Sequence, residues 1–165
     1  MTIFPTNNYE FELTKESTDA LSELEKNTLI SDSLFVSERT KKAFIGQIND
    51  NGFEIISSKP GRGPFCIYTG KLKSKKGTLE IKIHKAYKIM LSFIYLFPIT
   101  LFIIALFTME KEIITSLIFT TILILIALRF VFTELAFRFI SRNVLKELTE
   151  IIGINNLKKT KNNII

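Results

Sequence analysis

The chain has 165 residues, of which 22 are basic and 16 acidic, and it contains one cysteine, one histidine and 15 phenylalanines. This length allows one ordinary domain, or a small domain with a membrane segment. One cysteine excludes an internal disulfide, and one cysteine with one histidine excludes a zinc site of the usual four-ligand kind. The mean hydropathy of +0.25 is high for a soluble protein, so the location of the apolar residues decides the class of protein.

Charge is segregated along the chain. Residues 1–40 carry a net charge of −5, residues 41–88 of +8, residues 89–135 of −1 and residues 136–165 of +4. The two basic blocks flank the most apolar part of the sequence, which favours a membrane surface over nucleic acid as the anionic partner. The composition, rich in lysine, isoleucine and asparagine, is also typical of AT-rich coding, which by itself raises the lysine count.

Residues 1–88 predict a cytoplasmic α+β domain. Polar and apolar side chains alternate over residues 9–13, which predicts a strand. Thr14 then fits as the N-cap of a helix over residues 15–26, in which Ala20, Leu21 and Leu24 share one face. A short strand is predicted at residues 34–36.

Two hairpins complete this domain. The first joins strands at residues 43–48 and 53–57 through Asn49-Asp50-Asn51-Gly52, a turn signal because Asn and Gly tolerate positive φ. The second joins strands at residues 65–73 and 78–84 through a turn at residues 74–77. The expected fold is a curved antiparallel sheet with one helix, of a size that buries only a modest core.

Residues 89–134 predict a transmembrane helical hairpin. The first span, at about residues 89–109, has 21 residues without a charge and would extend about 31 Å, the thickness of a hydrocarbon core. The second span, at about residues 113–133, contains Arg129 near its end, where the side chain can snorkel to the head groups. The alternative is a buried hairpin of a soluble protein, but soluble helices are rarely apolar on all sides.

Basic residues near the span ends predict the orientation of the hairpin. They precede the first span and follow the second, whereas the connecting turn has only Lys111. We therefore expect a multi-pass protein of the bacterial inner (cytoplasmic) membrane with both termini in the cytoplasm. The first residues lack the basic and apolar regions of a signal peptide, so the first span is expected to direct its own insertion.

Eight basic side chains are expected to lie at the membrane surface and to contact anionic lipid head groups. They are Lys71, Lys73, Lys82, Lys85, Lys88, Arg129, Arg138 and Arg142. Each basic residue near such a surface gains about 1 kcal/mol from anionic lipid. For the strand lysines the alternative is a solvated sheet edge that prevents aggregation. The expected partners are thus the bilayer and its anionic lipids, and no nucleic acid.

Residues 135–153 predict an amphipathic cytoplasmic helix that continues the second span. Its apolar stripe consists of Phe137, Ile140, Val144, Leu148 and Ile151, and Gly153 suits the C′ position. This stripe can cover the sheet, lie on the membrane or pair with a second copy of the chain in a homo-oligomer. Residues 154–165 are expected to form a flexible basic tail.

No catalytic residue, metal ligand or cofactor site is predicted, and the chain is not expected to be an enzyme. None of the common nucleophile, zinc-protease, P-loop or CxxC motifs occurs. His84 is expected to face the surface at a strand end, and Cys66 to be a small buried strand residue rather than a reactive thiol. Gly61-Arg62-Gly63 is interpreted as a strand connection, with a phosphate-binding loop as the alternative.

Several short motifs precede the first span: Phe44-Ile45-Gly46-Gln47-Ile48, Phe53-Glu54-Ile55, Gly70 and Gly77-Thr78-Leu79-Glu80-Ile81. In this order, and followed by the span, they resemble an uncharacterised family of small bacterial two-span membrane proteins. Members of that family have an N-terminal β-rich cytoplasmic domain. The resemblance covers about residues 9–150. It implies the fold just described and no activity.

Two hypotheses of function follow. In the first, the chain is a non-catalytic integral inner-membrane protein whose cytoplasmic β-rich domain binds a partner protein or the membrane surface. In the alternative, it is a membrane effector of a bacterial defence or stress system. Its soluble domain would then sense a small anionic ligand, such as a nucleotide, and its spans would oligomerise to perturb the membrane.

Overall fold

The structure is a computed structural model that describes residues 4–34, 40–61, 63–108 and 110–160. The chain forms two compact units. The sheet unit consists of Thr6–His84 and Phe139–Ile165, and the hairpin unit consists of Met1–Pro5 and Lys85–Arg138. The fold is therefore α+β, with two helices that are apolar enough to span a membrane.

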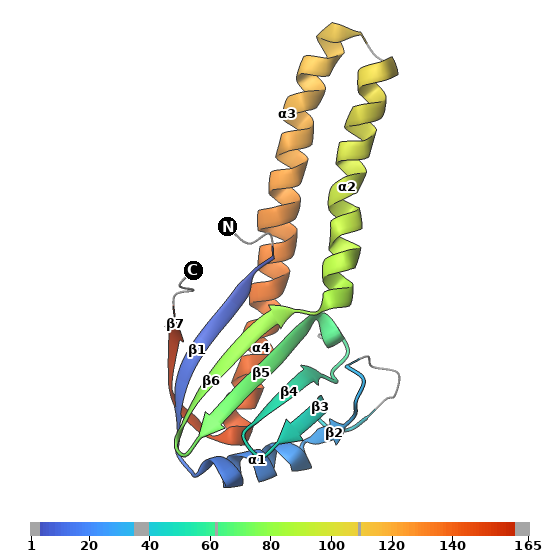
Figure 1. Cartoon of the computed structure of the whole chain (residues 1–165). Coiled ribbons are helices and arrows are strands. Elements are labelled where there is room, and N and C mark those ends of the chain that lie inside the picture. The colour runs from blue at the N-terminus through green and yellow to red at the C-terminus, as the bar shows by residue number, and fades with distance from the viewer. Residues whose placement is uncertain (1–3, 35–39, 62, 109, 161–165) are drawn as a thin grey trace. The chain divides into compact units, whose positions relative to one another are not determined.

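The sheet unit contains a seven-stranded sheet in the order β2-β3-β4-β5-β6-β1-β7 (Figure 1). The strands are β1 (Thr6–Leu13), β2 (Thr28–Ile30), β3 (Phe44–Asn49), β4 (Gly52–Ser57), β5 (Cys66–Lys73), β6 (Lys76–Ile83) and β7 (Ile154–Thr160). The prediction of a purely antiparallel sheet is wrong at one pair, because β2 and β3 run parallel. The connection between them, residues 31–43, has the length that a parallel crossover needs.

Both predicted hairpins are confirmed, and both have two-residue loops. Asn49 pairs with Gly52 in the first, and Lys73 pairs with Lys76 in the second. Positive φ was the expected reason for the first turn, and this is wrong, because none of the residues Asn49 to Gly52 has positive φ. In the second turn Ser74 does have a positive φ, of 53°. The strand predicted at residues 34–36 lies mostly outside the described residues.

Helix α1 (Ser17–Lys26) starts later than predicted. Its N-cap is Glu16, because Thr14 is engaged elsewhere: the Thr14 amide and hydroxyl both donate to the Gly153 carbonyl, at 2.9 and 3.1 Å. Ala20, Leu21 and Leu24 are buried, as the pattern predicts. The helix therefore packs by its expected apolar face.

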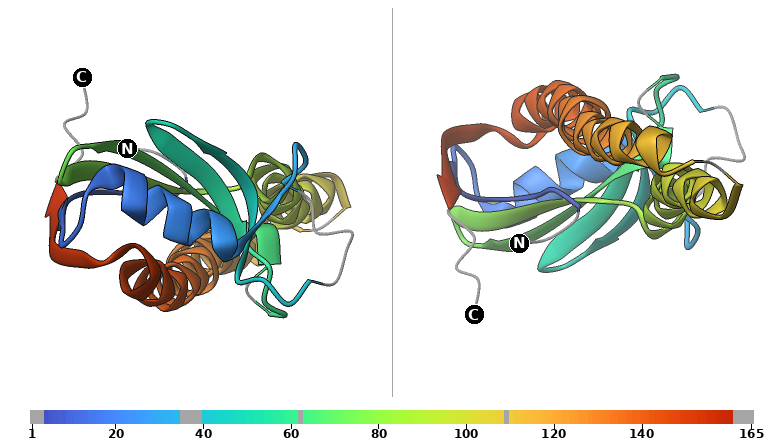
Figure 2. Two further views of the ribbon diagram at one scale, coloured as in Figure 1. Left: turned by 90° about the horizontal axis from the view of Figure 1, so that it is seen from below. Right: turned by 90° about the horizontal axis from the view of Figure 1, so that it is seen from above.

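The core of the sheet unit lies between one face of the sheet and two helices. Helix α1 and the part of α4 (Leu135–Ile152) from Phe139 onward lie on the same face of the sheet (Figure 2). Within this part of α4, Val144, Leu148 and Ile152 are fully buried, whereas Ile140 and Ile151 are half-buried. Of the three alternatives for the C-terminal stripe, the structure shows packing on the sheet, with the buried face centred on Val144 and Leu148.

Residues 154–160 form strand β7, so the predicted flexible tail is wrong for these residues; residues 161–165 lie outside the described part. Strand β7 pairs antiparallel with β1, from Leu13 with Ile154 to Asn8 with Thr160. Gly153, with a φ of +72°, turns the chain from α4 back toward β1. The sequence of β7 is mostly polar, and its backbone hydrogen bonds are made with a strand almost 150 residues away. No local sequence pattern predicts such a pairing.

The hairpin unit consists of α2 (Lys85–Thr108), α3 (Lys111–Ala127), a π-helical segment η2 (Leu128–Glu134) and the start of α4. Helices α2 and α3 lie side by side (Figure 1). Helix α2 and the continuous helix over Ile113–Ile152 are long and apolar enough to cross a membrane. Only 11% of the most apolar stretch of α2 is buried, and the corresponding stretch of the second long helix is not buried at all. The apolar side chains of both helices therefore point outward.

Candidate binding surfaces

The sheet face opposite α1 and α4 is here called the outer face, and it carries the strand lysines. In the β5–β6 register Lys82 pairs with Ile67 and Lys73 with Lys76, which places Lys71, Lys73 and Lys82 on this one face, as the alternation predicted. At one end of this face Ile45, Ile56 and Ile67 form a buried apolar cluster, and the partly buried Leu29 and Leu34 pack against it. The remainder of the face is polar.

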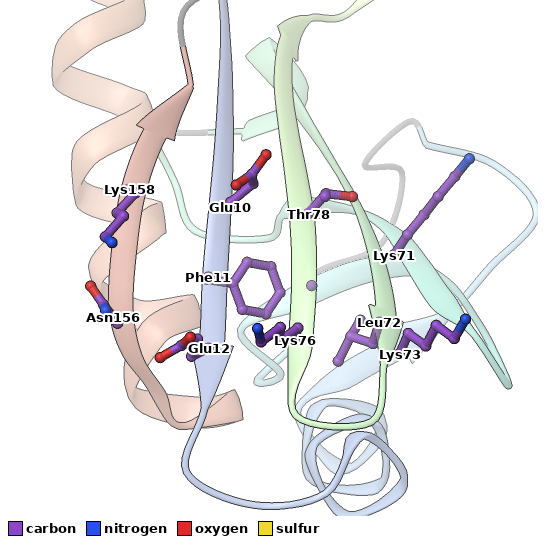
Figure 3. A pocket seen from close by; sticks show the side chains of 11 residues that line it. Glu10, Phe11, Glu12, Lys71, Leu72, Lys73, Lys76, Thr78, Asn156 and Lys158 are labelled. Atoms are coloured by element: carbon purple, nitrogen blue, oxygen red, sulfur yellow. The ribbon is translucent and has the colours of Figure 1, made fainter.

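A hollow of about 430 Å³ crosses strands β5, β6, β1 and β7 on this face (Figure 3). We call it the β5–β7 groove. Its charged lining consists of Lys71, Lys73, Lys76, Lys158, Glu10 and Glu12. Two further hollows, of about 320 and 630 Å³, adjoin it and share Lys71 with it. Lys71 is therefore at the centre of the polar face.

Two phenylalanine–glycine pairs shape the strands beneath the groove. A Cβ on Gly77 would lie 2.4 Å from the Phe11 ring, and one on Gly70 would lie 2.3 Å from the Phe53 ring. The glycines thus let the rings pack flat across neighbouring strands on the helix side of the sheet. Because Phe11 is turned to that side, Glu10 and Glu12 on either side of it face the groove.

The lysines of the groove are not used by the fold. Within the part of the chain that the structure describes, Lys71, Lys73, Lys76 and Lys158 make no side-chain hydrogen bond or ion pair, although Glu10 is the register partner of Lys158 and Glu12 of Lys76. Lys82 differs, because its ammonium lies 3.5 Å from Glu80. Four cations against two carboxylates leave the groove positive.

A second basic group belongs to the hairpin unit. It consists of Lys85 and Lys88 at the start of α2, Arg129 in η2 and Arg138 in α4. Glu134 bridges the two arginines: one oxygen lies 3.2 Å from Arg129 and the other 3.0 Å from Arg138. Lys88 lies over the ring of Phe4 at 6.0 Å.

The expected snorkelling of Arg129 stays a prediction, and the structure adds that its guanidinium pairs with Glu134 on its own helix. In a π-helix residues five apart face each other, and η2 places Arg129 and Glu134, which are five apart, in contact. The charge of Arg129 is therefore balanced by Glu134 within the same apolar segment. No π-helix could be inferred from this sequence, because it has no local signature here.

The eight predicted surface residues thus fall into two groups. Lys71, Lys73, Lys82 and Arg142 belong to the sheet unit, and Lys85, Lys88, Arg129 and Arg138 belong to the hairpin unit. Arg142 does not join the outer-face lysines, because it is exposed on α4, which covers the other face of the sheet. It lies near Tyr9, whose pKa is raised by burial and lowered in part by the arginine charge.

His84 is buried, with 8% of its surface exposed, so the expectation of a surface-facing side chain is wrong. Its backbone N–H donates to the Phe65 carbonyl at 2.9 Å, which holds the end of β6 against the start of β5. Burial lowers the pKa of His84, and the charge of Glu54 opposes this. A neutral imidazole is therefore favoured at neutral pH.

Cys66 is a fully buried strand residue, as expected. Burial raises the pKa of its thiol to about 12, and a hydrogen bond with Tyr68 opposes this shift. The thiolate needed for nucleophilic chemistry is therefore disfavoured.

Gly61 and Gly63 have positive φ in the connection that leads from β4 to β5 through η1 (Gly63–Phe65), and Arg62 between them lies outside the described residues. Among the described residues no group of three or more His, Cys, Asp or Glu side chains could hold a metal ion.

Comparisons of the chain with protein-family models, with curated proteins and with solved structures find no match. The class is thus defined by the fold alone. The chain is a small α+β sheet unit joined to a helical hairpin that is apolar enough to span a membrane.

Proposed function

We propose that the chain is a non-catalytic integral membrane protein whose cytoplasmic sheet unit binds a partner protein or the membrane surface. The observation that carries this proposal is the outward exposure of the apolar side chains of both long helices. Phe107 is 86% exposed and Phe119 72%. Apolar surface of this extent is stable only against lipid or another protein.

The orientation is supported by the basic residues of the hairpin unit. Lys85, Lys88, Arg129 and Arg138 lie near the ends of the helices that lead into the sheet unit, and the positive-inside rule places these ends in the cytoplasm. We therefore propose the bacterial cytoplasmic membrane as the location, with the sheet unit on the cytoplasmic side. The polar outer face then offers the binding surface.

Alkaline carbonate extraction tests the membrane part of this proposal. The wild-type chain should remain in the membrane pellet, whereas Ile104→Arg with Ile122→Arg should be extracted or lost, because each charge in the hydrocarbon core costs about 3 kcal/mol on insertion scales. The control is Ile30→Arg, an exposed apolar residue of the sheet unit, which should stay in the pellet. Extraction of the wild-type chain would refute membrane insertion.

A second function is favoured by the four unpaired lysines of the β5–β7 groove. In this function the chain is a membrane effector whose sheet unit senses an anionic ligand and whose spans oligomerise to perturb the membrane. Overexpression should then depolarise the cells, and Lys73→Ala with Lys76→Ala should remove that effect. Cells that keep their membrane potential while the chain is inserted at high level would exclude it.

A further inference from the structure

We propose that the β5–β7 groove binds a small organic molecule that carries two or more phosphate groups. This proposal rests on the second function above, which assigns anion sensing to the groove lysines, and it names the class of ligand. The binding itself requires neither membrane insertion nor oligomerisation, because the groove belongs entirely to the sheet unit. Both helices of that unit cover the opposite face of the sheet (Figure 2). The groove is therefore open to a ligand.

The lysines supply the anion-binding groups. Some other lysines of the sheet unit are engaged in ion pairs: Lys59 pairs with Glu147 at 2.6 Å, and Lys75 with Glu16 at 3.7 Å. The groove instead gathers four unpaired ammonium groups from three strands. These ammonium groups are donors of the kind that phosphate groups accept in charge-assisted hydrogen bonds.

The lysines frame the groove from several sides (Figure 3). Lys76 extends from β6 toward β1, Lys71 and Lys73 extend from β5 on the side away from β1, and Lys158 stands on β7. A lysine has a flexible four-carbon stem with three donors on its ammonium group. Lys76 thus lies beside β6 and β1, whereas Lys71 and Lys73 point away from these strands and reach a phosphate there by rotation of their flexible stems.

The other groups in the groove indicate an organic phosphate. Glu10 and Glu12 are acceptors, the Thr78 hydroxyl is both donor and acceptor, and the Asn156 amide offers both. Figure 3 shows the Glu10 carboxylate pointing from β1 toward β6. These groups suit the hydroxyl or amino groups of the ligand, since carboxylates repel phosphate itself.

The size and lining argue for a small molecule. A volume of about 430 Å³ falls within the range of small-molecule sites. Single-stranded nucleic acid is disfavoured, because its bases need exposed aromatic rings for stacking, and the one aromatic residue of the groove, Phe11, is 3% exposed.

Calorimetric titration of the full chain in detergent with inorganic tripolyphosphate tests the proposal. Lys73→Ala with Lys76→Ala should weaken binding by about tenfold or more, as expected for lost hydrogen bonds to charged groups. Lys41→Ala with Lys146→Ala removes the same charge from two exposed sites outside the groove and should leave binding within about twofold. Glu10→Gln with Glu12→Gln should tighten binding severalfold, because it removes two repulsive charges.

Three results would overturn the proposal. The first is no heat of binding with the wild-type chain at millimolar tripolyphosphate. The second is an equal loss in the groove pair and the control pair, which would mean attraction by net charge alone. In a separate arm the detergent-solubilised chain is mixed with vesicles of phosphatidic acid in neutral lipid. Groove-dependent binding to these vesicles, with none to soluble tripolyphosphate, would assign the lysines to a lipid head group instead.

Discussion

At the scale of single residues, Gly153 connects α4 to β7, and its carbonyl accepts hydrogen bonds from Thr14, the residue after β1. The Gly153 φ of +72° is a conformation that L side chains rarely adopt, and an added Cβ would lie 2.6 Å from the Thr14 hydroxyl oxygen. Gly61 has a similar φ of +76° with nothing within 4 Å of an added Cβ. At Gly61 an alanine would therefore cause backbone strain alone, whereas at Gly153 it would cause backbone strain and a steric clash.

We predict that Gly153→Ala lowers the free energy of unfolding of the sheet unit by about 2–3 kcal/mol, and Gly61→Ala by about 1 kcal/mol, since a left-handed non-glycine residue costs about 1–2 kcal/mol. Urea denaturation in detergent, followed by circular dichroism, measures both. Equal losses would show that Thr14 does not hold the turn.

Cys66 gives a prediction for alkaline pH. Its folded-state pKa of about 12 is higher than the value of about 8.5 in an unfolded chain. Between these values the unfolded state has lost the proton and the folded state keeps it. This group's contribution to stability is therefore complete below about pH 8.5 and falls by about 1.4 kcal/mol per pH unit above it.

Urea midpoints of the wild-type chain and of Cys66→Ala, measured from pH 8 to pH 10.5, test this prediction. The wild-type chain should lose stability faster than the variant over this range, because only the wild type has the thiol. Parallel curves would mean that the thiol is not protected from ionisation in the folded state.

At the scale of elements, η2 is joined to α2 by hydroxyl groups. The Tyr95 and Thr133 hydroxyl oxygens lie 2.6 Å apart, and the Leu128 carbonyl oxygen lies 3.1 Å from the Thr133 hydroxyl and 3.4 Å from the Tyr95 hydroxyl, so the two hydroxyl protons are shared among three contacts. The five-residue spacing of the π-helix brings Thr133 next to Leu128. The cluster therefore fixes the packing of the two helices at η2.

Tyr95→Phe and Thr133→Val should each destabilise the hairpin by about 0.6–1.7 kcal/mol, the range for hydrogen bonds between membrane helices. The double variant should lose little more than one single variant, because both remove the same contact. Thr100→Val is the control, since the Thr100 hydroxyl donates to Leu96 on its own helix. Steric-trapping measurements in bicelles give these energies, and additive losses would contradict the shared contact.

Helix α4 gives a prediction about the sheet unit. Val144 and Leu148 are fully buried, and burial of each such side chain stabilises the fold by about 1.5–3 kcal/mol. Val144→Asp with Leu148→Asp should therefore open the sheet unit to protease in detergent, with early cleavage near Gly61. Arg142→Asp, on the exposed side of α4, should not. Equal resistance of the two proteins would mean that the sheet closes its core without α4.

At the scale of the whole molecule, local patterns predicted the elements that depend on neighbouring residues. The two hairpins, α1 and the apolar helices have periodicity or turn residues within a short window. The three-residue β2 has no measurable alternation, and β7 depends on pairing with β1 at the other end of the chain. These elements could not be inferred because their stabilising contacts are non-local.

The same reason limited the prediction of the groove. Alternation along β5 placed Lys71 and Lys73 on one face, as the structure shows. Lys76 was assigned to the turn because Gly77 is a turn signal, whereas the structure pairs it with Lys73 in a tighter hairpin. Lys158 was missed because it belongs to β7. A lysine cluster assembled from three strands becomes visible only once their order in the sheet is known.

We propose that the hairpin crosses a membrane with both of its outer ends in the cytoplasm. This topology is tested most directly by labelling intact cells with an impermeant maleimide in a Cys66→Ser background. We expect Glu112→Cys, at the start of α3, to react, and Asn163→Cys to react only after the cells are lysed. Labelling of Asn163→Cys in intact cells, with Glu112→Cys protected, would contradict the account.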